Sequence, residues 1–161
     1  MKRVPLLRSL VSLLLSAGAV TFLTTTMVAA QGTHKGDFYT KADVERIIKR
    51  VEERSDAFRQ VVDRSLDRSA LNGTNREDNI NQQVKELERA IDDLRKDFDR
   101  AQTWEETRSQ VQRVLNEADE VNAIVRRGRW RRGGPVKAEW GLVRVDINKL
   151  AGIYNLRLLM A

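Results

Sequence analysis

Apolar residues recur along this chain at alternating steps of four and three. One series consists of Ile80, Val84, Leu87, Ile91, Leu94 and Phe98, and another of Val136, Trp140, Val143, Ile147, Leu150 and Tyr154. Steps of this size place every member of a series on one face of an α-helix, as in helices that pack into bundles. The pattern predicts two amphipathic helices, one ending near residue 100 and the other near residue 155.

Two further segments carry the same kind of apolar face. In residues 41–70 this face consists of Val44, Ile47, Ile48, Val51, Ser55, Phe58, Val61, Val62, Ser65 and Ser69. In residues 104–128 it consists of Trp104, Thr107, Val111, Val114, Ala118, Val121, Val125 and Gly128. No segment alternates with a period of two over the length of a strand, so we expect no sheet. The predicted fold is an all-α four-helix bundle made of two antiparallel helical hairpins.

The connection between the first two predicted helices contains a helix-capping turn. Asn72 and Gly73 both tolerate positive φ, which a tight turn requires. Thr74 and Glu77 follow with the spacing of a capping box, in which each side chain accepts a hydrogen bond from the other residue's backbone N–H.

Similar signals place the remaining boundaries. Thr40 to Asp43 and Thr103 to Glu106 have the capping-box spacing, and Gly133-Gly134-Pro135 separates the last two helices. We therefore expect the bundle to occupy residues 41–155 and an apolar C-terminal tail to occupy residues 156–161.

The first thirty residues have the pattern of an export signal. Lys2, Arg3 and Arg8 precede an apolar stretch that ends near residue 23, and Val28-Ala29-Ala30 presents small residues before Gln31. This pattern predicts a cleavable signal peptide over residues 1–30, followed by a flexible lead-in over residues 31–40. The expected location is periplasmic or secreted. An uncleaved N-terminal membrane anchor is the alternative, although the apolar run is short for a membrane span.

The segment Ser65–Asn81 has an Asp-Arg-Ser, Gly-Thr, Glu-Asp-x-Ile-Asn pattern between two helices. In this pattern, and in the segment Trp140–Tyr154, the chain resembles a group of small exported bacterial helical proteins. The resemblance implies an exported helical domain, and it brings no catalytic residue with it.

Charge is unevenly distributed over the 161 residues, whose formal net charge is +6. Residues 31–120 contain 17 lysines and arginines against 21 acidic residues, whereas residues 121–161 contain nine against two. The basic character therefore belongs to the C-terminal quarter and does not by itself indicate a nucleic-acid partner. The chain contains no cysteine, which excludes disulfides and thiolate metal sites.

The sequence lacks the residue combinations that common enzymatic sites need. His34 is the single histidine and falls in the predicted lead-in, away from any rigid partner that a hydrolase would need. Di-iron sites in helical bundles require Glu-x-x-His pairs, and no phosphate-binding glycine motif occurs. We therefore expect no enzyme, no cofactor, no metal and no catalytic residue.

Five arginines surround a tryptophan near the end of the third predicted helix. These residues are Arg126, Arg127, Arg129, Trp130, Arg131 and Arg132. One interpretation is a surface for anionic lipids, envelope polymers or an acidic protein face, with the indole ring at the depth of lipid headgroups. The other is that the arginines complement the helix dipole and keep the connection soluble.

The last predicted helix carries a second apolar face, opposite the first. Together with the tail it contains Ala138, Leu142, Val145, Ile153, Leu156, Leu158 and Leu159. Either the tail covers this face, or the face contacts a partner, such as a second copy of the chain.

These patterns favour a binding module of the cell envelope that self-associates or docks an envelope protein through its last helix. Peripheral attachment to anionic envelope surfaces through the arginine cluster is the alternative. A third possibility is a chaperone-like helical protein, which would need an exposed apolar concavity.

Overall fold

The computed structural model describes residues 39–160, apart from the side chain of Arg129. The predicted signal peptide, His34 and the lead-in before Tyr39 lie outside the described residues. The four α-helices are α1 (Lys41–Asp67), α2 (Asn75–Arg100), α3 (Arg108–Arg127) and α4 (Pro135–Ile153), with short 3₁₀ helices η1 (Trp104–Thr107) and η2 (Arg129–Arg132) on either side of α3. The described residues contain no strand, and the prediction of an all-α four-helix bundle is confirmed.

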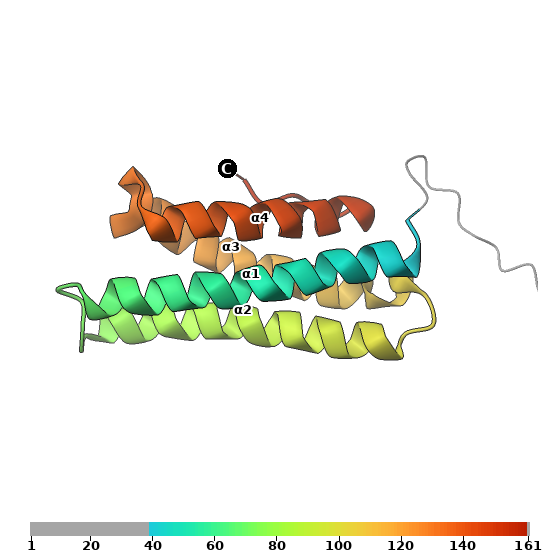
Figure 1. Ribbon diagram of the computed structural model, residues 1–161, viewed down its shortest axis with the longest axis horizontal. Coiled ribbons are helices and arrows are strands. Elements are labelled where there is room, and N and C mark those ends of the chain that lie inside the picture. Colours follow the sequence, from blue (N-terminus) through green and yellow to red (C-terminus); the bar gives the residue numbers. More distant parts are fainter. Residues whose placement is uncertain (1–38, 161) are drawn as a thin grey trace, which may run out of the picture. The chain divides into compact units, whose positions relative to one another are not determined.

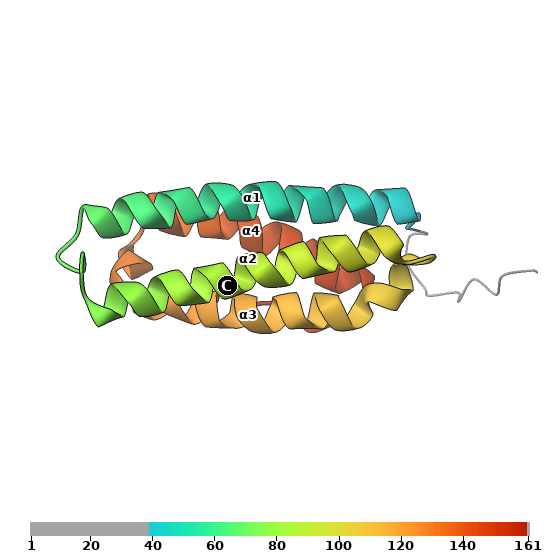
Figure 2. The same ribbon diagram turned by 90° about the horizontal axis from the view of Figure 1, so that it is seen from below.

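Successive helices run in opposite directions, which gives two antiparallel hairpins (Figure 1). The most extensive packing nevertheless joins the hairpins to each other, α1 against α4 and α2 against α3. Contacts between α1 and α2 and between α3 and α4 complete the bundle, so that α2 and α4 are placed diagonally (Figure 2). A change on α2 is therefore remote from the outer surface of α4.

The apolar series Ile80–Phe98 on α2 and Val136–Tyr154 on α4 are buried throughout, and one correction applies to α1. Leu66 is fully buried near the end of α1, whereas Ser65 and Ser69 are only half-buried. An α-helix has 3.6 residues per turn, so a strict repeat of four and three drifts around the helix over several turns. Over the length of α1 this drift moves Leu66 into the core.

Threonine hydroxyls cap the start of α1 and of η1. Thr40 and Asp43 exchange the two hydrogen bonds of a capping box, and Thr103 and Glu106 do the same. Hydrogen bonds donated by the threonines hold the pKa values of the Asp43 and Glu106 carboxyls below their usual range. Tyr39, in the predicted lead-in, packs against the core.

The turn between α1 and α2 differs from the predicted reciprocal capping box. Gly73 has φ +74°, and the Thr74 hydroxyl accepts from the Glu77 N–H at 3.4 Å. The Glu77 carboxylate accepts from the Gly73 N–H at 2.6 Å, because the Thr74 N–H already donates to the Leu71 carbonyl at 3.0 Å. The Asn72 side chain completes the turn by donating to the Asp67 carbonyl.

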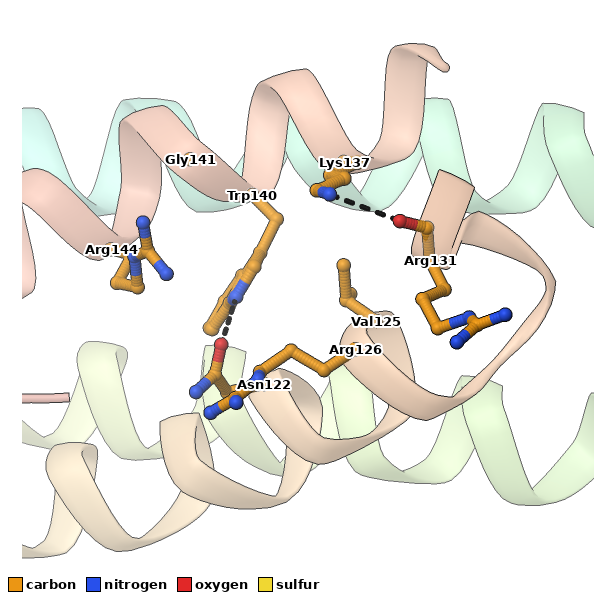
Figure 3. Close-up of a pocket in the computed structure, with 8 residues that line it drawn as sticks. All are labelled: Asn122, Val125, Arg126, Arg131, Lys137, Trp140, Gly141 and Arg144. Carbon is orange, nitrogen blue, oxygen red and sulfur yellow. Dashed lines mark hydrogen bonds between the residues drawn. The ribbon is translucent and has the colours of Figure 1, made fainter. Parts of the chain in front are cut away.

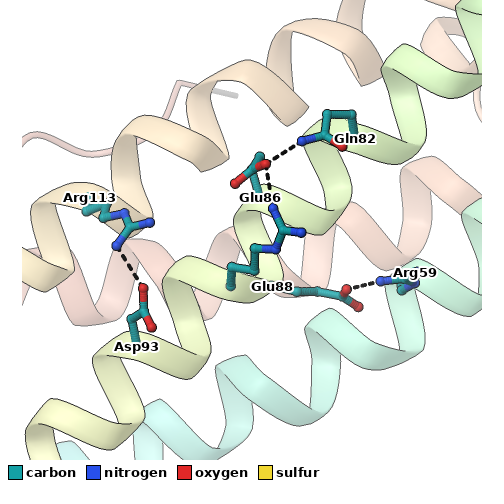
Figure 4. Close-up of polar contacts among 7 residues, drawn as sticks. Arg59, Gln82, Glu86, Glu88, Asp93 and Arg113 are labelled. Carbon is teal, nitrogen blue, oxygen red and sulfur yellow. Dashed lines mark hydrogen bonds and ion pairs between the residues drawn. The ribbon is translucent and has the colours of Figure 1, made fainter.

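Ion pairs link α2 to its two neighbours (Figure 4). Glu88 pairs with Arg59 on α1, and Asp93 accepts from Arg113 on α3 at 2.8 Å. Burial raises the pKa of the Glu88 carboxyl, although Arg59 acts in the opposite direction. Exposed pairs contribute about 0–1 kcal/mol each, so the apolar core is the main source of stability.

The end of α4 is fixed to η1 by Tyr154, which is almost completely buried. Its hydroxyl donates to the Trp104 carbonyl at 2.8 Å and lies 2.8 Å from Thr107 Oγ1. The Trp104 and Tyr154 rings meet edge to face at 5.0 Å. Burial raises the pKa of Tyr154 to about 12 from its ordinary value of 10.0.

We expect this tyrosine to make stability dependent on pH in the alkaline range. The folded state favours the neutral phenol, so its contribution is complete below pH 10 and is lost as the pH rises to about 12. Denaturant unfolding measured over this range should show a steeper loss of stability for the native chain than for Tyr154→Phe. Parallel curves for the two proteins would contradict the burial of the hydroxyl.

Candidate functional site

The described residues hold no group of three histidine, cysteine or acidic side chains that could bind a metal ion. None of the helices in this part of the chain is long and apolar enough to cross a membrane. The candidate sites in this part of the chain are hollows and charged surfaces.

The strongest candidate is a cleft between α3, η2 and α4, with a volume of about 340 Å³. We call it the basic cleft. It is lined by Asn122, Val125, Arg126, Arg131, Lys137, Trp140, Gly141 and Arg144 (Figure 3). Four of these eight residues are cationic, and none is acidic.

The floor of the basic cleft is rigid. Trp140 is 2% exposed, and its ring packs against Phe58 of α1 with the ring centroids 5.2 Å apart. Its indole N–H donates to Asn122 Oδ1 at 2.9 Å, which joins α4 to α3 (Figure 3). Both side chains of the floor are therefore buried and hydrogen-bonded to each other.

The cations come from three different elements. Arg126 lies on α3, Arg131 on η2, and Lys137 and Arg144 on α4. Lys137 Nζ donates to the Arg131 carbonyl at 3.0 Å, which fixes η2 beside α4 (Figure 3). Within residues 39–160, no carboxylate forms an ion pair with any of the four. Their positive potential is therefore directed at solvent.

Gly141 leaves the backbone of α4 uncovered at the basic cleft. A methyl group added there would meet no atom within 4 Å, so packing does not require a glycine. Glycine inside a helix costs about 1 kcal/mol relative to alanine. The space above Gly141 is open to a ligand. Gly152 is equally uncrowded but does not line the cleft.

The C-terminal tail returns along α3 and α4 and ends beside the basic cleft. Asn148 exchanges two hydrogen bonds with the backbone of Leu159, at 2.7 and 3.1 Å. The Met160 carbonyl accepts from Asn122 at 3.0 Å and from Arg144 at 3.2 Å. Two residues that line the cleft therefore also hold the tail.

The structure divides the arginine cluster and corrects the prediction for its tryptophan. Trp130 is only 5% exposed, and its indole N–H donates to Ser65 Oγ of α1 at 3.0 Å. It packs inside the bundle because η2 lies against α3 and α4 and its indole ring reaches α1, so it is not free to reach a lipid interface.

The four arginines of the cluster whose side chains are described lie in different places. Arg126 and Arg131 line the basic cleft, whereas Arg127 lines a second hollow between α2 and α3. Arg132 is exposed, and the side chain of Arg129 lies outside the described residues. The cluster is thus not a single surface.

The second hollow has a volume of about 920 Å³ and lies beside the α1–α2 turn. Its walls combine cations (Arg76 and Arg127), an acid (Glu120) and apolar side chains that include Ile80 and Ile124. This mixed lining indicates no single class of ligand.

The second apolar face of α4 is only partly exposed. Ile153 and Leu159 are buried and Leu156 is half-buried, so these three predicted partner contacts are corrected to internal packing. They are covered because the tail folds back over the end of α4. Ala138, Leu142, Val145 and Leu158 remain exposed, as does Met160.

Several important residues escaped prediction from the sequence. Lys137, Arg144 and Asn122 line the basic cleft but lie outside the arginine cluster, and only the packing of α3 beside α4 brings them together. Asp146 is buried at 3% exposure, although it is not on the apolar series of α4. Its position three residues after Val143 and four before Leu150 was the available signal that it borders the core.

Comparisons with protein-family models, with curated proteins and with solved structures give no match to this chain.

Proposed function

We propose that this protein is a binding module that holds an anionic group of its ligand in the basic cleft. The observation that carries the proposal is that four cationic residues, Arg126, Arg131, Lys137 and Arg144, contribute to the lining of one hollow that has no carboxylate. Like charges gathered around one hollow repel each other, and an anion between them relieves that repulsion.

The donor types favour a phosphate-like group. Arginine presents several N–H donors in a planar fork that matches phosphate and carboxylate oxygens, and lysine adds a compact charge. Three arginines and one lysine contribute to the lining of the cleft, which also includes the uncovered helix backbone at Gly141. Such a lining can surround an anion from several sides.

The same lining supports binding and not catalysis. Apart from the four cations it consists of an amide, a tryptophan, a valine and a glycine. None of these groups is a nucleophile or a base that exchanges protons near neutral pH. The export signal predicted from residues 1–30 would place the ligand in the cell envelope or outside the cell.

The structure changes the relative support for the functions predicted from the sequence. Because Ile153 and Leu159 are buried, fewer apolar side chains of α4 and the tail are exposed for self-association. In contrast, the lining of the basic cleft includes Lys137 and Arg144 in addition to Arg126 and Arg131. Binding of anions is therefore better supported than docking of a protein through an apolar face.

Pyrophosphate is a suitable soluble probe, and calorimetric titration measures its binding. We expect saturable binding that weakens with added salt. Replacing the three exposed cations of the cleft, Arg126→Gln, Arg131→Gln and Lys137→Gln, should weaken it at least about tenfold. Arg144 is left in place because it also holds the tail.

A matched variant removes the same charge from the diagonal helix: Lys85→Gln, Lys96→Gln and Arg100→Gln on α2. All three residues are exposed and lie outside the cleft, so binding should stay within about twofold of the native value. In a second matched pair, Gly141→Leu should fill the cleft and weaken binding, whereas Gly152→Leu should not. Equal effects of the paired variants would refute a site in the basic cleft.

A further inference from the structure

We infer that the anionic group belongs to a lipid surface, and that the basic cleft and an adjoining apolar strip dock together onto an anionic bilayer. The inference rests on the proposed function, since it names the source of the anion that the cleft holds. The strip consists of Ala138, Leu142, Val145, Leu158 and Met160.

The large apolar side chains exposed in the described residues are confined to α4 and the tail. They are Leu142, Val145, Leu158 and Met160, with exposed fractions of 46%, 59%, 52% and 65%. The other three helices present no comparable side chain to solvent in this part of the chain. Exposed apolar groups gathered on one element of a small domain mark an interaction surface.

The strip borders the basic cleft. Ala138, Gly141, Leu142 and Val145 follow the i, i+3, i+4, i+7 spacing and so lie along one face of α4, where Gly141 also lines the cleft. On the tail, the Met160 carbonyl accepts hydrogen bonds from Arg144 and Asn122 of the cleft. The apolar strip therefore adjoins the basic cleft both on α4 and at the end of the tail.

This combination fits the boundary of an anionic bilayer. Apolar side chains enter the layer between headgroups and acyl chains, while lysine and arginine meet the lipid phosphates. The cleft can accept one headgroup phosphate, and the strip can lie against the acyl region beside it.

Charge argues against a second copy of the chain as the occupant. A two-fold dimer places the same patch of both copies face to face. Pairing the strip with itself would bring the cations of the two clefts near one another without an acidic group among the lining residues. Like charges brought together across an interface oppose association, whereas an anionic surface attracts them.

Co-sedimentation with vesicles tests the inference on the protein as its host produces it. We expect binding to vesicles that contain phosphatidylglycerol and phosphatidylcholine, and at least about tenfold weaker binding to phosphatidylcholine alone. The triple variant Leu142→Ser, Val145→Ser and Leu158→Ser should lose about tenfold in affinity for the anionic vesicles. Its affinity for pyrophosphate should remain unchanged, because the cleft is intact.

An inserted fluorophore gives a second readout. Val145→Trp should show a blue shift and enhanced emission when anionic vesicles are added, because the indole enters an apolar layer. Gln82→Trp, on the exposed side of the diagonal helix α2, is the matched control and should not respond.

The outcomes separate the two proposals. Pyrophosphate binding without vesicle binding would overturn the lipid inference and leave the proposed function in place, with a soluble phosphate as the ligand. Failure of both would overturn both. A native dimer that dissociates in the triple serine variant would show that a second copy covers the strip, and would also overturn the inference.

Discussion

Replacing Trp130 with alanine is expected to lower the free energy of unfolding by about 3–5 kcal/mol. The side chain is 5% exposed in the bundle, and its indole N–H donates to Ser65 Oγ at 3.0 Å. Truncation removes a large apolar group from the contact between η2 and α1 and leaves a cavity. Chemical denaturation of the two proteins measures the difference.

Neighbouring substitutions serve as controls for this result. Arg132→Ala, on the exposed side of the same short helix, should change stability by no more than about 0.5 kcal/mol. Ser65→Ala leaves the indole N–H without its partner and should cost about 1–2 kcal/mol. A tryptophan on the surface, as the arginine-rich sequence suggested, would give no loss for Trp130→Ala.

The contrast between Trp130 and the helix faces shows where prediction from the sequence succeeds. The buried faces of α2 and α4 could be predicted because helical periodicity is a local property of the sequence. Every member of the series Ile80–Phe98 and Val136–Tyr154 is buried. Trp130 lies in the connection between α3 and α4, where no helical periodicity indicates which side chains are buried. Its burial depends on how η2 packs against α3 and α4 and directs the indole ring toward α1, which is set by the tertiary structure.

The basic cleft was predictable only in part for the same reason. Arg126 and Arg131 belong to a dense run of arginines that stands out in the sequence. Lys137 and Arg144 stand alone among apolar neighbours on α4, and they join the cleft because α4 packs beside α3. The sequence left open whether the tail covers the second apolar face of α4. In the structure Leu159 covers part of this face, while Leu142 and Val145 stay exposed.

Replacing Arg54 with methionine is expected to cost about 2–3 kcal/mol of unfolding free energy. Asp146 of α4 is buried, and Arg54 Nη1 of α1 lies 2.7 Å from its Oδ2. The same guanidinium donates to the Leu142 carbonyl at 3.1 Å. Without Arg54 the carboxylate remains in the contact between α1 and α4 with little to balance its charge, whereas methionine keeps most of the apolar packing.

Arg50 offers a matched control on the same helix. Its Nη1 lies 3.9 Å from Asp146 Oδ1 and its side chain is more exposed, so Arg50→Met should cost less than about 1 kcal/mol. The double variant Arg54→Met and Asp146→Leu should recover most of the lost stability, because an apolar pair can replace a buried ion pair at little cost. Equal small losses for Arg50→Met and Arg54→Met would mean that water reaches the carboxylate. In that case the α1–α4 contact would depend on its apolar residues alone, and the double variant would gain nothing over Arg54→Met.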